Sequence, residues 1–176
     1  MTKPIDRQDP RRLILEIGHD RQLKPDTDQT DAPERPSLAG CRILLAEDDP
    51  TSQVLVVGIL EKAGVEITAV KDGKLALDSA LAARGNGNPF DIILMDIQMP
   101  LMGGDEATKL LRDKGYSKAI IALTAHTMDG DREKYLEIRF NDYATKPIAR
   151  AKLIETIHQH WVGAEAVPAT QLGVAP

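Results

Sequence analysis

The sequence predicts an α/β domain built on a five-stranded parallel sheet with helices on both faces. Short apolar runs alternate with stretches whose apolar residues recur three and four positions apart, which are the patterns of a buried strand and of an amphipathic helix. Aromatic residues make up only 3% of the chain. The core must therefore consist mainly of Ile, Leu, Val and Ala, which suits parallel strands covered by helices.

The strands and helices can be placed in order along the chain. Strands are predicted at 43–46, 65–70, 92–95, 120–123 and, more weakly, 142–145. Helical spacing occurs between and after these runs, at Val54, Val57 and Leu60, at Ala76, Ala80 and Ala83, at Ala107, Leu110 and Leu111, and at Leu153, Ile154 and Ile157. Repeated strand–helix units imply right-handed crossovers, and in such sheets ligands bind beyond the carboxyl ends of the strands.

Capping residues agree with these boundaries. Asp49 is a favourable N-cap, and Pro50 behind it suits the first helical position. Asp72 can cap the second helix in the same way. Gly64 stands where a helix commonly ends in a left-handed conformation.

The chain of 176 residues has room for one ordinary domain and some additional sequence. Residues 1–38 contain five prolines among many polar residues, which predicts a flexible leader or linker. Its apolar island at 13–17 is either a short docking element or a local feature of a coil. Residues 162–176 lack apolar periodicity and are expected to form a disordered tail, so residues 39–161 form the predicted domain.

Charge and composition exclude several classes of function. The 22 Lys and Arg residues against 27 Asp and Glu residues give a net charge of −5, which disfavours direct binding to nucleic acid. A single cysteine, Cys41, cannot form an intramolecular disulfide, and no Cys/His cluster has zinc spacing, which favours a reducing, cytoplasmic location. No apolar run approaches the length of a membrane span, and no secretory signal is visible.

Acidic residues gather at the predicted ends of two strands. Glu47, Asp48 and Asp49 follow the first strand, and Asp96 ends the third. Carboxylates this close repel one another unless a proton or a cation intervenes, and an all-oxygen set favours a hard ion such as Mg²⁺. The first three residues alone could equally be an acidic N-cap cluster. Asp96, at the same edge of the sheet, favours the metal.

Two further residues complete the predicted edge. Thr124 ends the fourth strand and Lys146 follows the fifth. Separately, a Thr in this place often bonds local backbone and a Lys before a proline is often solvated. Together they offer a hydroxyl and an ammonium group that can hold phosphoryl oxygens beside a carboxylate and a metal. This combination predicts a site that accepts a phosphoryl group.

At these residues the sequence resembles the receiver domains of two-component signalling, most of all those of hybrid histidine kinases. The resemblance extends over residues 41–161 and implies a flavodoxin-like fold with strand order 2-1-3-4-5. It rests on ILLAEDDPTSQ (43–53), FDIILMDIQMPLMGG (90–104), AIIALTAHTMDGDREKYL (119–136) and NDYATKPI (141–148).

The resemblance implies a role for each residue at the edge. Asp96 would accept the phosphoryl group from a phosphohistidine, Lys146 would pair with that group, and Thr124 would bond another of its oxygens. The implied ligands of Mg²⁺ are Asp48 directly, Glu47 through water, Asp96 and the main-chain carbonyl of Gln98. The chemistry expected of the chain extends to its own phosphorylation and dephosphorylation, with no turnover of a separate substrate.

The resemblance also implies a switch and its partners. Tyr143 would move inward as Thr124 is drawn to the phosphoryl group, which alters the face formed by the fourth helix, fifth strand and fifth helix. Alternatively, Tyr143 is a half-buried strand residue with its hydroxyl in water. A histidine kinase or a histidine phosphotransfer protein is the expected partner, and the same face is a candidate homodimer surface. The Lys146–Pro147 bond is expected to be cis.

The resemblance further implies that two residues flank the water that hydrolyses the acyl phosphate. Gln98 and His126 stand two positions beyond Asp96 and Thr124, respectively. Gln98 can orient water but cannot ionise, while His126 can donate, accept, obstruct or simply point to solvent. Both are expected to modulate the lifetime of the phosphorylated form.

One junction departs from the family pattern. Receivers of this kind usually place a glycine after the fourth helix, whereas here Arg139 or Phe140 occupies the position that suits a left-handed cap. Phe140 is either an exposed contact residue or, as is commoner for an aromatic, a core residue.

Of three readings of the function, the sequence favours the first. The first is a phosphoryl-accepting receiver, either standing alone or part of a hybrid kinase, since no kinase or output domain is recognisable on either side. The second is a pseudo-receiver that binds proteins without phosphate. The third is a Mg²⁺-dependent phosphohydrolase, although Gln98 stands where such an enzyme would be expected to carry an acid.

Overall fold

The computed structural model describes residues 37–125 and 131–165, all of them within one compact unit, Arg35–Pro176. Most of the predicted leader and tail lies outside these ranges and stays a prediction. Where they overlap the described residues the predicted bounds of the domain are too narrow, because Leu38 is buried in the core and the last helix continues to Glu165. None of the helices in the described residues combines the length and apolar character needed to cross a membrane.

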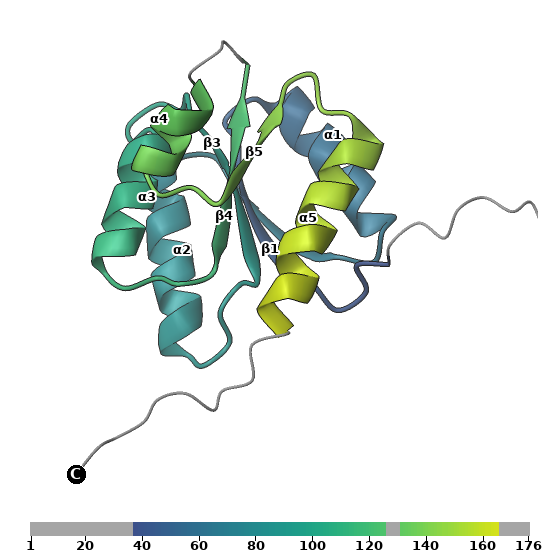
Figure 1. Cartoon of the computed structure of the whole chain (residues 1–176), viewed down its shortest axis with the longest axis horizontal. Helices are drawn as coiled ribbons and strands as arrows, with labels where there is room; N and C mark the ends of the chain where they lie inside the picture. Colours follow the sequence, from purple (N-terminus) through teal and green to yellow (C-terminus); the bar gives the residue numbers. More distant parts are fainter. Residues whose placement is uncertain (1–36, 126–130, 166–176) are drawn as a thin grey trace, which may run out of the picture. The chain divides into compact units, whose positions relative to one another are not determined.

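Five parallel strands form a single sheet, as predicted (Figure 1). Their order is β2-β1-β3-β4-β5, which is the flavodoxin-like order that the resemblance to receiver domains implied. The strand bounds differ by no more than one residue at either end from the predicted apolar runs. They are β1 (Arg42–Ala46), β2 (Glu66–Val70), β3 (Ile92–Asp96), β4 (Ala119–Thr124) and β5 (Asp142–Thr145).

The helices cover both faces of the sheet, with α1 and α5 on one side and α2, α3 and α4 on the other (Figure 1). Alternate residues of β1 face opposite sides of the sheet. Ile43 and Leu45 pack with α1 and α5, whereas Leu44 and Ala46 pack on the side of α2, α3 and α4. Both faces of a buried strand must be apolar, so β1 and β3 appear in the sequence as continuous apolar runs. The helices are α1 (Pro50–Glu61), α2 (Gly73–Gly85), α3 (Gly104–Asp113), α4 (Asp131–Glu137) and α5 (Arg150–Glu165).

The predicted caps are confirmed. The Asp49 side chain accepts hydrogen bonds from the main-chain N–H groups of Thr51 and Ser52, with Pro50 as the first helical residue. Asp72 accepts from the Leu75 N–H at the start of α2. Gly64 has φ of +86° and ends the turn that follows α1.

The junction after α4 uses an arginine where a glycine was expected. Arg139 adopts φ of +74°, a left-handed conformation that disfavours a residue with a Cβ. The Arg112 guanidinium holds this junction by donating from Nε to the carbonyl of Arg139, at 3.1 Å. It also donates to the carbonyls of Tyr116 and Lys118 and to the side-chain oxygen of Asn141. The departure from the family pattern is therefore accommodated by hydrogen bonding.

Phe140 lies in the core. Its exposed fraction is only 3%, and its ring meets that of Tyr135 edge to face at 6.2 Å. Of the two readings that the sequence allowed, the core position is confirmed and the exposed contact residue is excluded.

Candidate functional site

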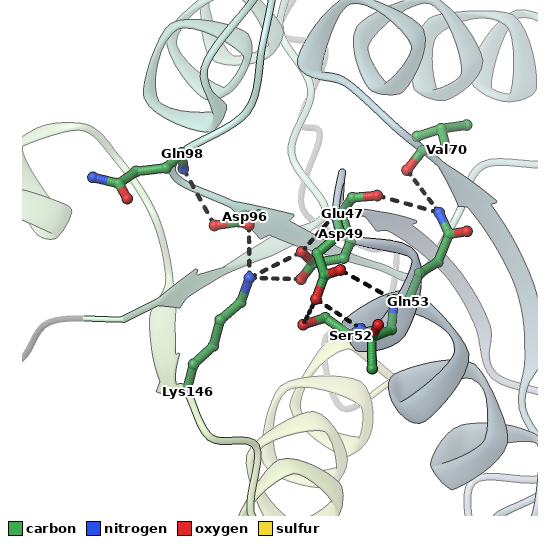
Figure 2. A network of polar contacts seen from close by, with 9 residues as sticks. Glu47, Asp49, Ser52, Gln53, Val70, Asp96, Gln98 and Lys146 are labelled. Atoms are coloured by element: carbon green, nitrogen blue, oxygen red, sulfur yellow. Dashed lines mark hydrogen bonds and ion pairs between the residues drawn. The ribbon is translucent and has the colours of Figure 1, made fainter.

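Four strands end at one edge of the sheet and bring the predicted residues together, and Figure 2 shows Glu47, Asp96 and Lys146 at this edge. Glu47 follows β1, Asp96 is the last residue of β3, Thr124 is the last of β4, and Lys146 follows β5. The register of the parallel strands aligns these ends, since Asp96 pairs with Leu123 in β4. The order of the strands thus gathers side chains that are far apart in the sequence.

Lys146 bridges two buried carboxylates, as Figure 2 shows. Its Nζ lies 2.7 Å from Asp96 Oδ2, 2.7 Å from Glu47 Oε2 and 3.0 Å from Glu47 Oε1. The side chains of Glu47 and Asp96 are 0% and 8% exposed, while that of Lys146 is 22% exposed. Buried carboxylates are costly without a counter-charge, and Lys146 supplies one. The Lys146–Pro147 bond is cis, as expected.

The charges at this edge depend on one another. Burial raises the pKa of Glu47, and the negative charge of Asp96 raises it further, while Lys146 opposes both effects. For Lys146, burial alone would lower the pKa, but its bonds to Asp96 and Glu47 outweigh burial and raise it. Lys146 therefore remains an ammonium ion at neutral pH, and a further positive charge would relieve the carboxylates.

Three carboxylates lie close enough together to serve as metal ligands. Glu47, Asp48 and Asp96 each offer an oxygen, and these oxygens lie within 4.8 Å of one another. Glu47 Oε2 is buried and accepts no hydrogen bond, although the Lys146 ammonium is close. Asp48 is exposed, which leaves an approach from solvent. An all-oxygen set with an unsatisfied buried oxygen fits a hard divalent cation such as Mg²⁺.

Asp49 has a different task from its two acidic neighbours. It caps α1, and the Ser52 hydroxyl donates to its Oδ2 at 2.9 Å. This bond and those from the first-turn N–H groups lower the pKa of Asp49. The sequence left open whether the three consecutive acids form a cap or a metal site. The structure divides them, with Asp49 as the cap and Glu47 and Asp48 facing Asp96.

Gln98 meets Asp96 through its backbone. Its N–H donates to Asp96 Oδ1 at 3.2 Å, while its side chain points away from the carboxylates (Figure 2). The use of its main-chain carbonyl as a metal ligand stays a prediction. His126, the other residue expected to affect phosphate lifetime, lies outside the described residues.

Gln53 is a supporting residue that sequence reasoning missed. From α1, its Nε2 donates to the main-chain carbonyls of Glu47 and Val70, at 3.2 and 3.3 Å. These bonds tie the ends of β1 and β2 to the helix (Figure 2). Nothing in the local sequence distinguishes this glutamine from an ordinary polar residue of an exposed helix face.

A cleft of about 320 Å³ continues from the acidic edge towards α4. Asp96, Thr124 and Lys146 line one part of it, and Tyr135 of α4 and Ile138, in the turn after that helix, line another. Inside this region the hydroxyl oxygens of Thr124 and Tyr135 lie 2.8 Å apart. Tyr135 was not singled out from the sequence, where its spacing is that of an ordinary helical core residue.

Tyr143, the predicted switch residue, is half-buried in β5. Its ring packs against that of Tyr135, with the ring centroids 5.8 Å apart. It therefore adjoins the cleft through Tyr135. The inward movement implied by the resemblance stays a prediction.

The start of α3 lies against the end of β3. The Gly104 N–H donates to the carbonyl of Ile97 at 3.0 Å. A Cβ on Gly104 would overlap the main-chain oxygen of Asp96. Only glycine permits this approach, so Gly104 fixes the backbone from which the Asp96 side chain projects.

Several characterised proteins resemble this chain. A family model described as the response regulator receiver domain matches residues 43–158. Hybrid signal transduction histidine kinase I of Dictyostelium discoideum is 46% identical over 121 residues, which cover 66% of this chain and 7% of that kinase. Two-component response regulator 24 of Arabidopsis thaliana is 32% identical over 130 residues, which cover 73% of this chain and 91% of that regulator.

Solved structures agree with these matches. The receiver domain of a sensor histidine kinase from Pseudomonas aeruginosa, with a magnesium ion coordinated in its active-site cleft, is 42% identical with a TM-score of 0.61. The match covers 71% of this chain and 99% of that one. A Saccharomyces cerevisiae response-regulator receiver domain, crystallised with a histidine phosphotransfer protein, is 28% identical with a TM-score of 0.62, covering 74% and 94% of the two chains.

Proposed function

The chain belongs to the response regulator receiver domain family, and from this premise we propose that it accepts a phosphoryl group on Asp96 in a two-component phosphorelay. The observation that carries the proposal is the bridge of Lys146 between Asp96 and Glu47, beside the cluster of three carboxylates. A nearly buried aspartate with its own cation and a metal-binding arrangement has the parts that phosphoryl transfer requires.

The transfer itself is a displacement at phosphorus. A carboxylate oxygen of Asp96 forms a bond to the phosphorus of a phosphohistidine as the phosphorus–nitrogen bond breaks. The electron pair of that bond leaves with the imidazole, which is neutral when its other nitrogen carries a proton. Lys146 pairs with the incoming phosphoryl oxygens, and the Thr124 hydroxyl donates to one of them.

The acidic residues at the edge support the proposed cofactor. Asp48, Glu47, Asp96 and the main-chain carbonyl of Gln98 would hold Mg²⁺, as in the sequence-based prediction. When bound, Mg²⁺ would neutralise charge on the transferred group. The residues present fit that ion through their oxygen chemistry and through the unsatisfied buried Glu47 Oε2.

We propose that the phosphohistidine donor, a kinase or phosphotransfer protein in the cytoplasm, docks on α1. Val54 and Leu55 are 73% and 51% exposed, and Val57, Gly58 and Glu61 help to line a shallow groove on this helix. Because α1 begins next to the acidic edge, a partner resting on it would approach Asp96. The solved complex of a related receiver domain with a histidine phosphotransfer protein supports a partner of this class.

The proposed output remains the face formed by α4, β5 and α5. Tyr143 on this face is half-buried and contacts Tyr135, which in turn reaches Thr124. This chain of contacts supports a route by which phosphorylation alters the face. The same surface is proposed for homodimer formation.

Labelling with a small phosphodonor tests the acceptor. We expect acetyl phosphate with Mg²⁺ to add one phosphoryl group, detectable by mass spectrometry, and Asp96→Asn to abolish the addition while the fold is retained. A pseudo-receiver would give no labelling, and a phosphohydrolase would give rapid turnover without a stable product. Stoichiometric labelling of the Asp96→Asn variant would overturn the assignment.

Labelling by a protein donor tests the docking surface. Val54→Asp should slow transfer from a phosphorylated histidine phosphotransfer protein at least about tenfold, equivalent to about 1.4 kcal/mol, and leave labelling by acetyl phosphate unchanged. Leu136→Asp is the matched control, because Leu136 is 48% exposed on α4, across the sheet from α1. Equal slowing by both variants would contradict docking on α1.

A further inference from the structure

A tyrosine outside the predicted set reaches into the candidate site. Tyr135 of α4 and Thr124 of β4 are 7% and 5% exposed, and their hydroxyl oxygens lie 2.8 Å apart. Both residues line the cleft that also contains Asp96 and Lys146. The Tyr135 ring is held by contacts with the rings of Phe140 and Tyr143. The tyrosine hydroxyl is thus fixed at the threonine that the proposed reaction uses.

The chemistry of the two hydroxyl groups favours one direction for their hydrogen bond. Each has one hydrogen to donate and two lone pairs to accept. A phenol, with a pKa near 10, is more acidic than an aliphatic alcohol and is the better donor. With Tyr135 donating to Thr124 Oγ1, the threonine donates its own hydrogen to an acceptor other than Tyr135. Phosphoryl oxygens on Asp96 would be such an acceptor, because they carry no hydrogen to donate.

We infer that Tyr135 is a positioning residue for phosphoryl transfer, whose hydroxyl donates to Thr124 Oγ1 and directs the threonine hydrogen towards the phosphoryl group. This inference rests on the proposed acceptance of phosphate by Asp96. Tyr135 does not touch the reacting atoms and acts through Thr124. The opposite arrangement, with Thr124 donating to Tyr135, would restrain the threonine, so removal of the phenol would then speed the reaction.

The two arrangements predict changes of opposite sign in Tyr135→Phe. This variant keeps the ring contacts and removes only the hydroxyl. We expect the initial rate of labelling by acetyl phosphate and Mg²⁺ to fall about 3- to 10-fold, the range expected for one hydrogen bond. Tyr116→Phe is the matched control, because it removes another buried tyrosine hydroxyl, which bonds the Phe90 carbonyl. Its labelling rate should equal that of the unaltered chain.

A double-variant cycle separates positioning from a general structural role. In a Thr124→Val background Tyr135→Phe should have no further effect, whereas in a Thr124→Ser background, which keeps a hydroxyl, the 3- to 10-fold loss should return. An unchanged or faster rate in Tyr135→Phe would overturn the inference. So would an equal loss in the Val background. Failure of the unaltered chain to label would instead overturn the proposed function, and this inference with it.

A second replacement covers the case in which Tyr135→Phe does not fold. A fluorinated tyrosine at position 135 keeps the hydroxyl and the ring but is more acidic, and so is a stronger donor. The inference predicts that its labelling rate equals or exceeds that of the unaltered chain at a pH where the phenol stays protonated. A slower rate there would overturn it.

Discussion

The start of α3 and the end of α4 are two places where the backbone is tightly constrained, and the chain treats them differently. Gly104 begins α3 against the Asp96 carbonyl, where any Cβ would overlap an oxygen. Arg139, after α4, carries a full side chain at φ of +74°. The first constraint is an overlap with a fixed atom, and the second is a cost in torsional energy. Hydrogen bonds from Arg112 offset a torsional cost but cannot remove an overlap.

The largest effect is expected at the first position. Gly104→Ala should lower the free energy of unfolding by about 3 kcal/mol and slow the labelling of Asp96, because the end of β3 must move to admit the methyl group. Chemical denaturation and phosphorylation rates measure the two effects. Gly58→Ala is the control, since a Cβ on Gly58 meets nothing within 4 Å, and it should stabilise α1 by roughly 0.5 to 1 kcal/mol. If Gly104→Ala and Gly58→Ala changed the free energy of unfolding and the labelling rate equally, the close contact at Gly104 would not be a constraint.

The next effect concerns the hydrogen bonds that hold the second position. Arg112→Ala should cost about 2 to 3 kcal/mol, because three carbonyl groups and the Asn141 side chain lose their donor. Denaturant titration measures the loss. Arg84→Ala, which removes a single bond to the exposed carbonyl of Lys114, should change the stability by less than about 0.5 kcal/mol. A similarly small change for Arg112→Ala would show that the junction does not depend on its guanidinium.

Tyr116, whose main-chain carbonyl also accepts from Arg112, adds a pH dependence. Burial raises its pKa to about 12, and the value in the unfolded chain is near 10. The folded state therefore holds the phenol proton more tightly, and this contribution to stability is complete below pH 10 and is lost between pH 10 and 12. The loss amounts to about 2 kcal/mol. Plots of the free energy of unfolding against pH for the unaltered chain and for Tyr116→Phe should converge over this interval. Parallel plots would contradict the raised pKa of Tyr116.

The smallest effect is a gain. Arg139→Gly should raise the free energy of unfolding by about 0.5 kcal/mol, because relief of the left-handed strain exceeds the loss of an exposed ion pair with Asp113. Arg139→Ala keeps the strain and loses the same ion pair, so it should bring no gain. Thermal melting compares the two. A lower melting temperature for the glycine variant would mean that the junction is not strained.

Much of this molecule could be predicted from its sequence because the decisive signals are local. Apolar runs identified every strand, and capping chemistry identified the starts of α1 and α2 at Asp49 and Asp72. The acidic edge followed because parallel strands align their carboxyl ends. Glu47, Asp96, Thr124 and Lys146 are indeed brought to one place.

The remaining features depend on contacts between elements. Gln53 and Arg112 look like ordinary helical residues until the carbonyl groups that they bind are in place. Tyr135 follows the spacing of a core residue, and only the packing of α4 over β4 reveals the partner of its hydroxyl. An N-cap and a metal ligand would both use a carboxylate at position 49, so the sequence did not distinguish these two roles for Asp49. Distances, which the sequence does not contain, separated them.

The bridge made by Lys146 also bears on how the domain is completed. Lys146 is 99 positions from Glu47 and 50 positions from Asp96 in the sequence. The bridge can therefore form only when β5 has joined the rest of the sheet. A chain that ends before β5 would hold Glu47 and Asp96 close together with no internal counter-charge. Lys146, the residue after β5, thus supplies the positive charge that allows the carboxylates at the ends of β1 and β3 to lie side by side. The proposed acceptance of phosphate by Asp96 would on this account be a property of the finished sheet, and phosphorylation of a nascent chain should begin only after residue 146 has folded into place.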